Sequence, residues 1–217
     1  EEIADHISGE IGQGIDFLET NLRDVPKRQR SMRATLDHSW NLLTEREREM
    51  FQALSVFRGG FTREAAQRVT GASLRELMAL ADKSLLHCAP TGRYEVHELL
   101  RQYAADRLRR ADKLRRADKL RRAEKLDQEP AVGKAARDLH CAYYTAALER
   151  WEADLKGPRQ QAALAEMDIE IENARAAWDW AVEQSQVDRL NRAMEGLCLY
   201  YWRRSRNLEG GAACRMA

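Results

Sequence analysis

No apolar stretch in the 217-residue sequence approaches the roughly 18 residues that a membrane span needs. The acidic beginning, EEIADHISGE, has neither the basic nor the apolar region of a secretory signal peptide. The four cysteines are widely spaced and form no CxxC pair, which excludes a disulfide scaffold and favours reduced thiols in a cytoplasmic protein. With 36 Lys+Arg against 35 Asp+Glu, the net charge of +1 argues against a chain built wholly for nucleic acid.

Catalytic and metal-binding patterns are missing too. The sequence has no GxxxxGK[ST] loop to hold phosphates and no acidic strand after it to hold Mg²⁺, so we expect no ATP hydrolysis and no catalytic residue. His140 and Cys141 are neighbours on a predicted helix and face different ways. A metal site would need His6, His87 and His140 to converge with cysteines from distant segments, so no metal is expected. The sequence does not begin with Met and ends inside a helix-like pattern, from which we expect a piece of a longer protein.

Four short helices are predicted in the first half, because apolar residues recur at spacings of three and four. Two of them open with capping boxes, Thr44–Glu47 and Ser73–Glu76, and Thr62 can cap a third. Gly59-Gly60 and Gly71 would end the second and the third. The helices are expected at about 31–43, 44–57, 63–69 and 73–83, after a linker of Pro26, Lys27, Arg28 and Arg30.

A β-hairpin is predicted next. Residues 85–89 and 93–96 alternate apolar and polar side chains on either side of the turn Pro90-Thr91-Gly92. A helix resumes at Glu98. Three helices, a hairpin and a return helix are the order of a winged helix, which we place at residues 26–106.

A hexapeptide repeat follows, LRRADK, LRRADK and LRRAEK, within residues 108–126. At about 100° per residue, each hexad advances by about 600°, so successive leucines point in three directions and form no apolar stripe. Pairs of an acid and a base four residues apart would support the helix instead, as with Asp106 and Arg110 or Asp112 and Arg116.

This repeat is strongly basic. Residues 106–125 hold ten Lys/Arg and four Asp/Glu, a net charge of +6. We interpret residues 107–130 as an exposed helical spacer. The alternative is a basic helix that binds phosphates or anionic lipid, with candidate contacts from Arg109, Arg110, Arg115, Arg116, Arg121 and Arg122.

The remainder of the chain is helical in pattern, with helices expected at 134–155, 160–184 and 187–204. The expected buried stripe of the first comprises Leu139, Tyr143, Ala147, Trp151 and Leu155. Such stripes predict antiparallel helix hairpins. They also suit a TPR-like solenoid of about 34 residues per helix pair, here degenerate, and an ordinary bundle is the alternative.

A family resemblance rests on three segments, SVFRGGF, DKSLL and YEVHELLRQYA. Over about residues 26–108 the chain resembles the winged-helix region of bacterial signal-transduction ATPases of the STAND class. These are similar to NB-ARC proteins and often carry TPR arrays. The segment DIEIENARAAWDWAVEQ at 168–184 resembles the helices that open their repeat region. The resemblance implies that residues 1–25 are the tail of the helical lid that precedes the winged helix.

In NB-ARC proteins a Met-His-Asp motif follows the hairpin, and its His senses the ADP phosphate. The aligned residues here are Val96, His97 and Glu98, with Glu in place of Asp. The resemblance therefore implies that His97 is a nucleotide sensor supported by Val96 and Glu98. A His at a strand-to-helix junction can donate to a phosphate beside the free N–H groups of the helix. The alternative is that His97 only caps or packs this junction.

DNA binding is the alternative function, since a winged helix places a helix in the major groove. That helix would be 73–83, whose charged residues sum to zero and which offers only Arg75 and Lys83 to base edges. We expect this helix to pack against protein.

The sequence thus predicts a mainly α bacterial protein of the cytoplasm. Its parts are a lid remnant (1–25), a winged helix (26–106), a basic spacer (107–130) and a TPR-like domain (131–217). The expected function is regulatory protein–protein contact within a nucleotide-dependent signalling ATPase, without catalysis by this chain. The expected partners are a nucleotide-binding domain that holds ADP or ATP with Mg²⁺, and a protein ligand of the TPR-like helices. Neither DNA nor a membrane is an expected partner.

Overall fold

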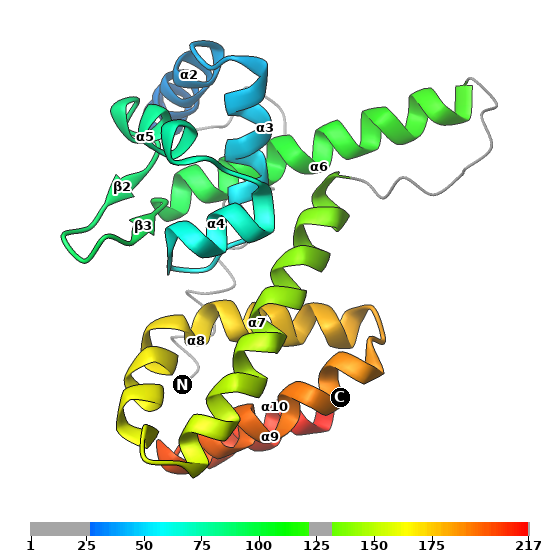
Figure 1. Ribbon diagram of the computed structural model, residues 1–217. Coiled ribbons are helices and arrows are strands. Elements are labelled where there is room, and N and C mark those ends of the chain that lie inside the picture. The colour runs from blue at the N-terminus through cyan, green and yellow to red at the C-terminus, as the bar shows by residue number, and fades with distance from the viewer. Residues whose placement is uncertain (1–26, 122–131, 217) are drawn as a thin grey trace. The chain divides into compact units, whose positions relative to one another are not determined.

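A computed structural model describes residues 27–121 and 132–216. Within these ranges the chain forms nine helices and one small three-stranded sheet, which confirms the predicted mainly α fold (Figure 1). No helix in the described ranges is both long and apolar enough to cross a bilayer. The chain divides into two compact units, residues 1–48 and 49–217. The predicted lid at 1–25 lies outside the described residues.

The first unit contains α2 (Lys27–Asn41) and the first turn of α3 (Glu45–Leu54). The linker predicted at Lys27, Arg28 and Arg30 was wrong, because these residues are helical; Lys and Arg are good helix formers whatever their charge. The capping box that begins α3 is confirmed. Thr44 N–H donates to the Glu47 carboxylate at 2.7 Å, and Glu47 N–H donates to Thr44 Oγ1 at 3.3 Å.

The second unit begins with the rest of α3, then α4 (Arg63–Thr70) and α5 (Leu74–Asp82). Thr62 caps α4 and the Ser73–Glu76 box caps α5, as predicted. Gly71 ends α4 in the left-handed conformation, with φ of 72°.

The sheet has one strand more than predicted. Its strands are β1 (Gly60–Phe61), β2 (His87–Cys88) and β3 (Tyr94–Glu95), in the order β1-β3-β2 and all antiparallel. β1 was not predicted as a strand; its Gly60 was predicted only to end the preceding helix. A two-residue strand is too short to show an alternation of apolar and polar residues. Phe61 pairs with Tyr94 across the sheet and their rings stack at 6.1 Å.

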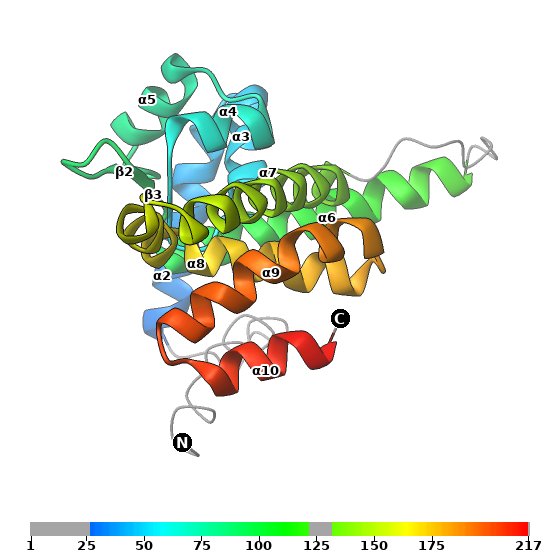
Figure 2. The same cartoon turned by 60° about the horizontal axis from the view of Figure 1, so that its bottom comes forward.

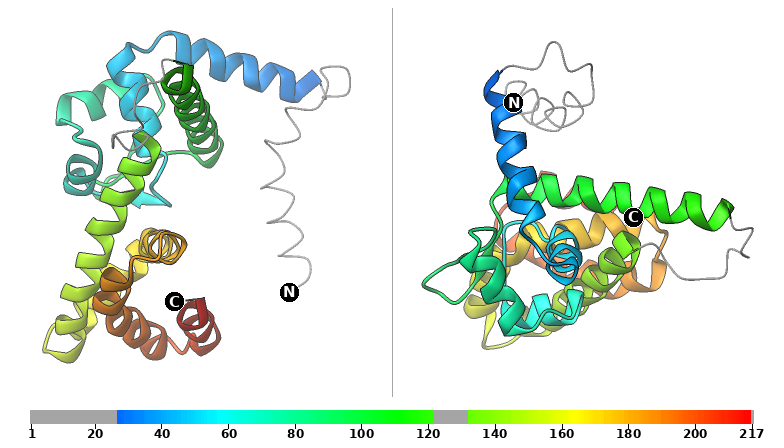
Figure 3. Two further views of the ribbon diagram at one scale, coloured as in Figure 1. Left: turned by 90° about the vertical axis from the view of Figure 1, so that its right-hand side faces the viewer. Right: turned by 90° about the horizontal axis from the view of Figure 1, so that it is seen from above.

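The return helix and the repeat form one helix, α6 (Glu98–Arg121), which Figure 3 shows without a break. Asp106 pairs with Arg110 at 2.9 Å, as predicted. Leu114 is 67% exposed, but Leu108 is buried with 2% exposed. Asp112 Oδ2 accepts a 3.2 Å hydrogen bond from Gly133 N–H, at the start of the next helix. One face of α6 is therefore packed as far as Asp112, and residues 113–115 after it are all exposed.

Four helices complete the chain: α7 (Val132–Lys156), α8 (Gln160–Glu183), α9 (Val187–Arg203) and α10 (Asn207–Met216). α7 packs against both α8 and α9, and α10 packs on α9 (Figure 2). A Cβ added to Gly196 of α9 would lie 2.3 Å from the carbonyl oxygen of Leu148, so α7 and α9 approach closely there. Each helix of the second half thus contacts the next or the next but one, as in a helical repeat.

The buried stripe of α7 was predicted correctly only in its second half. Ala147, Trp151 and Leu155 are buried, but Leu139 is 50% exposed. Four residues advance a helix by about 40° more than a full turn, so a strict four-residue stripe drifts off the core. The buried face at the start of α7 belongs to His140, Cys141 and Tyr144 instead.

Candidate functional site

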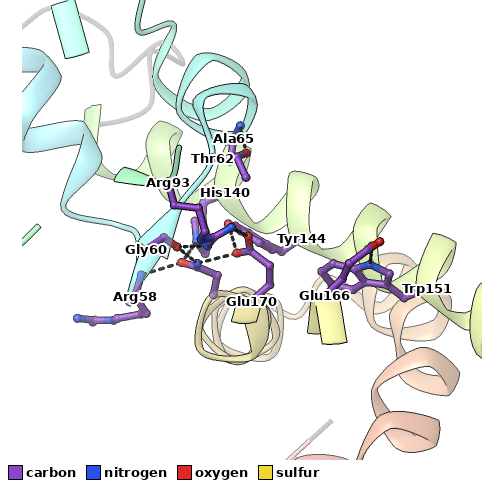
Figure 4. A network of polar contacts seen from close by, with 11 residues as sticks. Arg58, Gly60, Thr62, Ala65, Arg93, His140, Tyr144, Trp151, Glu166 and Glu170 are labelled. Atoms are coloured by element: carbon purple, nitrogen blue, oxygen red, sulfur yellow. Dashed lines mark hydrogen bonds and ion pairs between the residues drawn. The ribbon is translucent and has the colours of Figure 1, made fainter. Parts of the chain in front are cut away.

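Polar side chains from α7 and α8 meet the sheet at its β1 edge (Figure 4). We refer to these residues as the sheet–α8 cluster. They are Gly60, Arg93, His140, Tyr144, Glu170 and Asn173, together with the backbone N–H of Arg58. Two of its residues come from the winged-helix segment and four from helices more than 40 residues later in the chain.

Asn173 is the centre of the cluster and is fully buried, with 0% exposed. Its Nδ2 donates to the carbonyl of Gly60 at 2.9 Å, and its Oδ1 accepts from Arg58 N–H at 2.7 Å. A backbone N–H can only donate and a carbonyl can only accept, so these two partners fix which way the amide points. One side chain of α8 thus satisfies both backbone groups where the chain enters β1.

Arg93 lies just before β3 and connects the hairpin to Gly60 and to α8. Its Nη1 pairs with Glu170 Oε1 at 2.5 Å, and its Nη2 donates to the Gly60 carbonyl at 2.8 Å. The side chains of Arg93 and Glu170 are only 17% and 12% exposed. An ion pair so far removed from water is sensitive to the loss of either partner.

His140 contacts Asn173 from α7, with 3.4 Å between Nε2 and Oδ1. Because Oδ1 is an acceptor, Nε2 carries the hydrogen in this contact. The pKa of His140 is lowered to about 4, chiefly by burial; the Asn173 contact opposes the shift and the positive charge of Arg58 adds to it. His140 is therefore a neutral hydrogen-bond donor near pH 7.

Aromatic rings enclose the polar groups. Phe57 stacks on Phe61 at 4.4 Å and meets the edges of His140 and Tyr144 at 5.2 and 6.4 Å. Tyr144 donates to Glu170 at 3.0 Å, and burial, followed by the charge of Glu170, raises the pKa of its hydroxyl. The apolar surround strengthens each hydrogen bond of the cluster and makes the loss of one more damaging.

His97 occupies the N-cap position of α6 and is exposed. Its carbonyl accepts from Arg101 N–H at 2.9 Å, and its Nδ1 accepts from Leu99 N–H at 3.3 Å. Such a contact is the capping role given as the alternative to nucleotide sensing.

The neighbours of His97 support the same junction. Glu98 receives two hydrogen bonds from the buried Arg101, at 2.7 and 2.6 Å, and these lower the pKa of its carboxyl. Arg101 also donates to the Ser55 carbonyl at 3.3 Å, so Arg101, oriented by Glu98, holds α6 against the residue that follows α3. Val96 is half-buried beside them.

The basic residues of the repeat do not join this cluster. Arg109 and Arg110 both pair with Asp106, at 3.5 and 2.9 Å. Arg115 is exposed on α6. The side chains of Arg116 and Arg121, and the whole of Arg122, lie outside the described residues.

The helix that would read DNA, α5, buries one face and exposes another. Leu77 and Leu80 are fully buried, so this face of α5 packs on the core of its own domain. The exposed residues of α5 include Arg75, Met78 (53% exposed) and Asp82. Leu74, 38% exposed, adds a second apolar side chain to one base and one acid.

The sheet–α8 cluster is suited to holding α7 and α8 against the sheet and offers little for catalysis. Its donors and acceptors are paired with one another, so no group is left poised for a substrate. Asn173 and Glu170 lie in the family-like segment 168–184, but no role was predicted for them from the sequence. Arg93 was not singled out either. Asn173 lies between the apolar Ile171 and Ala174, and a polar residue among apolar neighbours of one helix is the signal that could have revealed it.

Comparison with known proteins gives one group of relatives. No family model matches the chain, and no solved structure matches it significantly. Three mycobacterial proteins, one from Mycobacterium bovis and two from strains of Mycobacterium tuberculosis, are each 31% identical over 192 residues. Each is named "Putative HTH-type transcriptional regulator". The alignment takes in 82% of this chain but only 19% of each relative, so the chain spans about a fifth of their length. The chain is therefore distantly similar to a segment of proteins that carry this name.

Proposed function

We propose that the chain serves in transcription regulation, as a protein-contact segment in which a winged helix (26–106) is fastened to a TPR-like helical domain (131–217). In this proposal residues 107–130 are the spacer and residues 1–25 the end of a preceding lid. The single observation that carries it is the buried Asn173 amide, which holds the backbone of Arg58 and Gly60 from α8.

The mycobacterial relatives support the regulatory part. Their name favours a DNA-binding regulator over a signalling ATPase. The name describes proteins about five times as long as the aligned segment, so the DNA-reading element of such a regulator need not lie in this segment.

The sheet–α8 cluster supports the protein-contact part. Arg93 and Gly60 are held by two residues of α8, so a displacement of α8 has to move the sheet or break an ion pair of low exposure. A ligand on the helical domain that shifts α8 can therefore reach the winged helix through this contact.

DNA reading by α5 is the second candidate, favoured by the winged-helix order and by the relatives' name. Against it, Arg75 is the one base within α5, and Met78 and Asp82 share the exposed surface.

In more detail, we propose that the chain belongs to a longer, nucleotide-dependent protein of the STAND class. This part of the proposal rests on the family-like segments. In such a parent His97 would meet the ADP phosphate held by a separate nucleotide-binding domain. The contact of Nδ1 with Leu99 N–H leaves the Nε2 hydrogen as the donor that a phosphate would accept. Val96 and Glu98 would set the position of this ring.

Selection from random DNA duplexes separates the two candidates. The purified chain is incubated with duplexes that have a randomised core, and bound DNA is sequenced over several rounds. We expect no enriched sequence, because α5 offers too few groups to base edges. An enriched motif that disappears in Arg75→Ala would establish the groove-reader function and overturn the protein-contact proposal.

Hydrogen exchange tests the fastening. Glu170→Ala should speed amide exchange in 58–61 and 93–96, because both segments lose their anchor, and should leave α4 unchanged. Glu172→Ala, an exposed acid on the same helix, is the matched control. Equal exchange in the two variants would mean that the cluster does not couple α8 to the sheet.

A further inference from the structure

Two cysteines far apart in the sequence meet on the last helix pair. Cys198 lies on α9 and Cys214 on α10, and their Sγ atoms are 3.1 Å apart. Both are free thiols; Cys214 is exposed and Cys198 is half-buried. The other two cysteines have different neighbours, since Cys88 faces its own loop carbonyl and Cys141 donates to Gln186.

The separation is short enough for a bond. A disulfide needs its sulfur atoms about 2.0 Å apart, so a closure of about 1 Å is required. Rotation of two side chains can supply this, because both lie near the surface of one helix hairpin. Thiols this close also react with each other's oxidised forms before a second molecule can arrive.

The helix that carries Cys214 is bound to α8. Trp178 Nε1 of α8 donates to the carbonyl of Ala213 at 3.2 Å in a buried hydrogen bond. Arg175, also of α8, pairs with Glu209. A Cβ on Gly210 would lie 2.9 Å from Tyr201, so α10 fits closely on α9 as well. α10 therefore contacts α8, the helix that carries Asn173 and Glu170.

We propose that Cys198 and Cys214 are a redox-modification site, at which hydrogen peroxide forms a reversible disulfide that locks α10 onto α9. The thiolate of Cys214 attacks one peroxide oxygen and the O–O bond breaks; the leaving hydroxide takes up the proton that the Cys214 thiol released, so a sulfenic acid and one water result. The sulfur of Cys198 then attacks the sulfur of Cys214 and the S–O bond breaks; the proton of Cys198 passes to the leaving hydroxide, which departs as the second water. Two thiols and one peroxide thus give one disulfide and two waters, with sulfur oxidised and peroxide reduced.

The surroundings decide the order of these steps. Cys214 is exposed and can meet the oxidant. Burial, with the adjacent Cys214, raises the pKa of Cys198 to about 11, so Cys198 is the less reactive thiol toward peroxide and takes the second step as the resolving thiol.

The locked state should stabilise the end of the helical domain. The disulfide closes a loop between residues 198 and 214, which restricts the unfolded chain. It also holds Ala213 against Trp178, and so makes α8 more rigid.

Peptide mapping of the peroxide-treated chain tests the proposal. The Cys88→Ser variant is used so that the exposed Cys88 forms no bond between molecules. Trypsin releases Cys198 in peptide 193–203 (AMEGLCLYYWR) and Cys214 in peptide 207–215 (NLEGGAACR). We expect these two peptides to be joined by a disulfide, with a loss of two hydrogen atoms from the intact mass and a melting temperature raised by several degrees. Dithiothreitol should reverse all three changes.

Control variants fix the interpretation. Cys198→Ser and Cys214→Ser, each in the same background, should show no rise in melting temperature after peroxide, and Cys198→Ser should retain sulfenic acid at Cys214. Recovery of the two peptides separately, with Cys214 over-oxidised, would overturn the proposed bond. A joined pair with an unchanged melting temperature would overturn the proposed lock.

Discussion

At the scale of single residues, Asn173 is the position where a small change should matter most. Asn173→Ala removes the donor to Gly60 and the acceptor for Arg58 N–H, and it leaves buried backbone groups without partners. We expect a loss of about 2–4 kcal/mol in the free energy of unfolding. Asn191→Ala on the exposed face of α9 is the matched control and should change it by less than about 0.5 kcal/mol. Urea denaturation followed by circular dichroism measures both; equal values would mean that water replaces the amide.

His140 makes stability depend on pH in one direction. Its pKa is about 4 when folded, below the value of 6.5 for a free side chain, so the unfolded state binds the proton more readily. The native state is therefore destabilised as pH falls from about 6.5 toward 4, by a total of roughly 3 kcal/mol, and this loss is absent above pH 7.

His140→Gln isolates that contribution. Gln does not titrate, and its amide can still donate to Asn173. The difference in unfolding free energy between wild type and variant should be nearly constant above pH 7 and should move in favour of the variant below pH 6. Denaturation curves at a series of pH values measure it. A difference that stays constant down to pH 4.5 would show that His140 takes up a proton without penalty when folded.

At the scale of elements, the repeat shows how identical residues differ once packed. Leu108 is 2% exposed and Leu114 is 67% exposed, although each begins an LRRADK unit of the same helix. Leu108→Ala should lower the free energy of unfolding by about 2–4 kcal/mol, and Leu114→Ala by less than about 0.5 kcal/mol. Deletion of 114–119 should likewise leave the melting temperature almost unchanged. A large drop in melting temperature on that deletion would mean that residues 114–119 are part of the packed core, and the spacer interpretation would fail for them.

Two glycines of the helical domain form a second contrast. A Cβ at Gly196 would meet a backbone carbonyl of α7 at 2.3 Å, whereas at Gly211 the nearest atom is the far end of Arg215 at 3.5 Å. Gly196→Ala should force α7 and α9 apart and lower the melting temperature by several degrees. Gly211→Ala should raise stability by about 0.5–1 kcal/mol, because Ala favours helix. Differential scanning calorimetry distinguishes the two, and a neutral Gly196→Ala would mean that the α7–α9 contact yields easily.

Local chemistry explains which elements were predictable. The capping boxes at Thr44 and Ser73 and the glycine stop at Gly71 act over a few residues, and each was found where the sequence placed it. The boundaries of α7, α8 and α9 also fell within one or two residues of those predicted. β1 was missed because its two residues are a strand only through pairing with β3, more than 30 residues away. The cluster was missed for the same reason, since Arg93 and Glu170 are 77 residues apart.

At the scale of the whole molecule, the question is how a chain of net charge +1 could contact DNA. The largest local excess of positive charge lies in the repeat, although α2 also carries four bases against one acid. The acids Asp106 and Asp112 of α6 are already engaged. Asp106 pairs with two arginines, and Asp112 accepts from the N-terminus of α7. Lys113 and Arg115 are exposed beyond them. We therefore expect the largest share of any affinity for DNA to reside in α6 and to be blind to sequence, because contacts with phosphates carry no base information.

A charge-matched pair of variants puts this to the test. The first replaces Arg109, Lys113 and Arg115 of α6 by Gln; the second replaces Arg63, Arg68 and Arg150, exposed on α4 and α7, by Gln. Fluorescence anisotropy with an arbitrary duplex should show weak binding by wild type that falls steeply with salt. The α6 variant should bind more weakly and flatten the slope of log K against log salt by up to about 3, whereas the second variant should keep most of the wild-type slope. If both variants lose affinity equally, binding follows net charge alone and α6 is no interface; if neither does, α5 becomes the surface to mutate, beginning with Arg75.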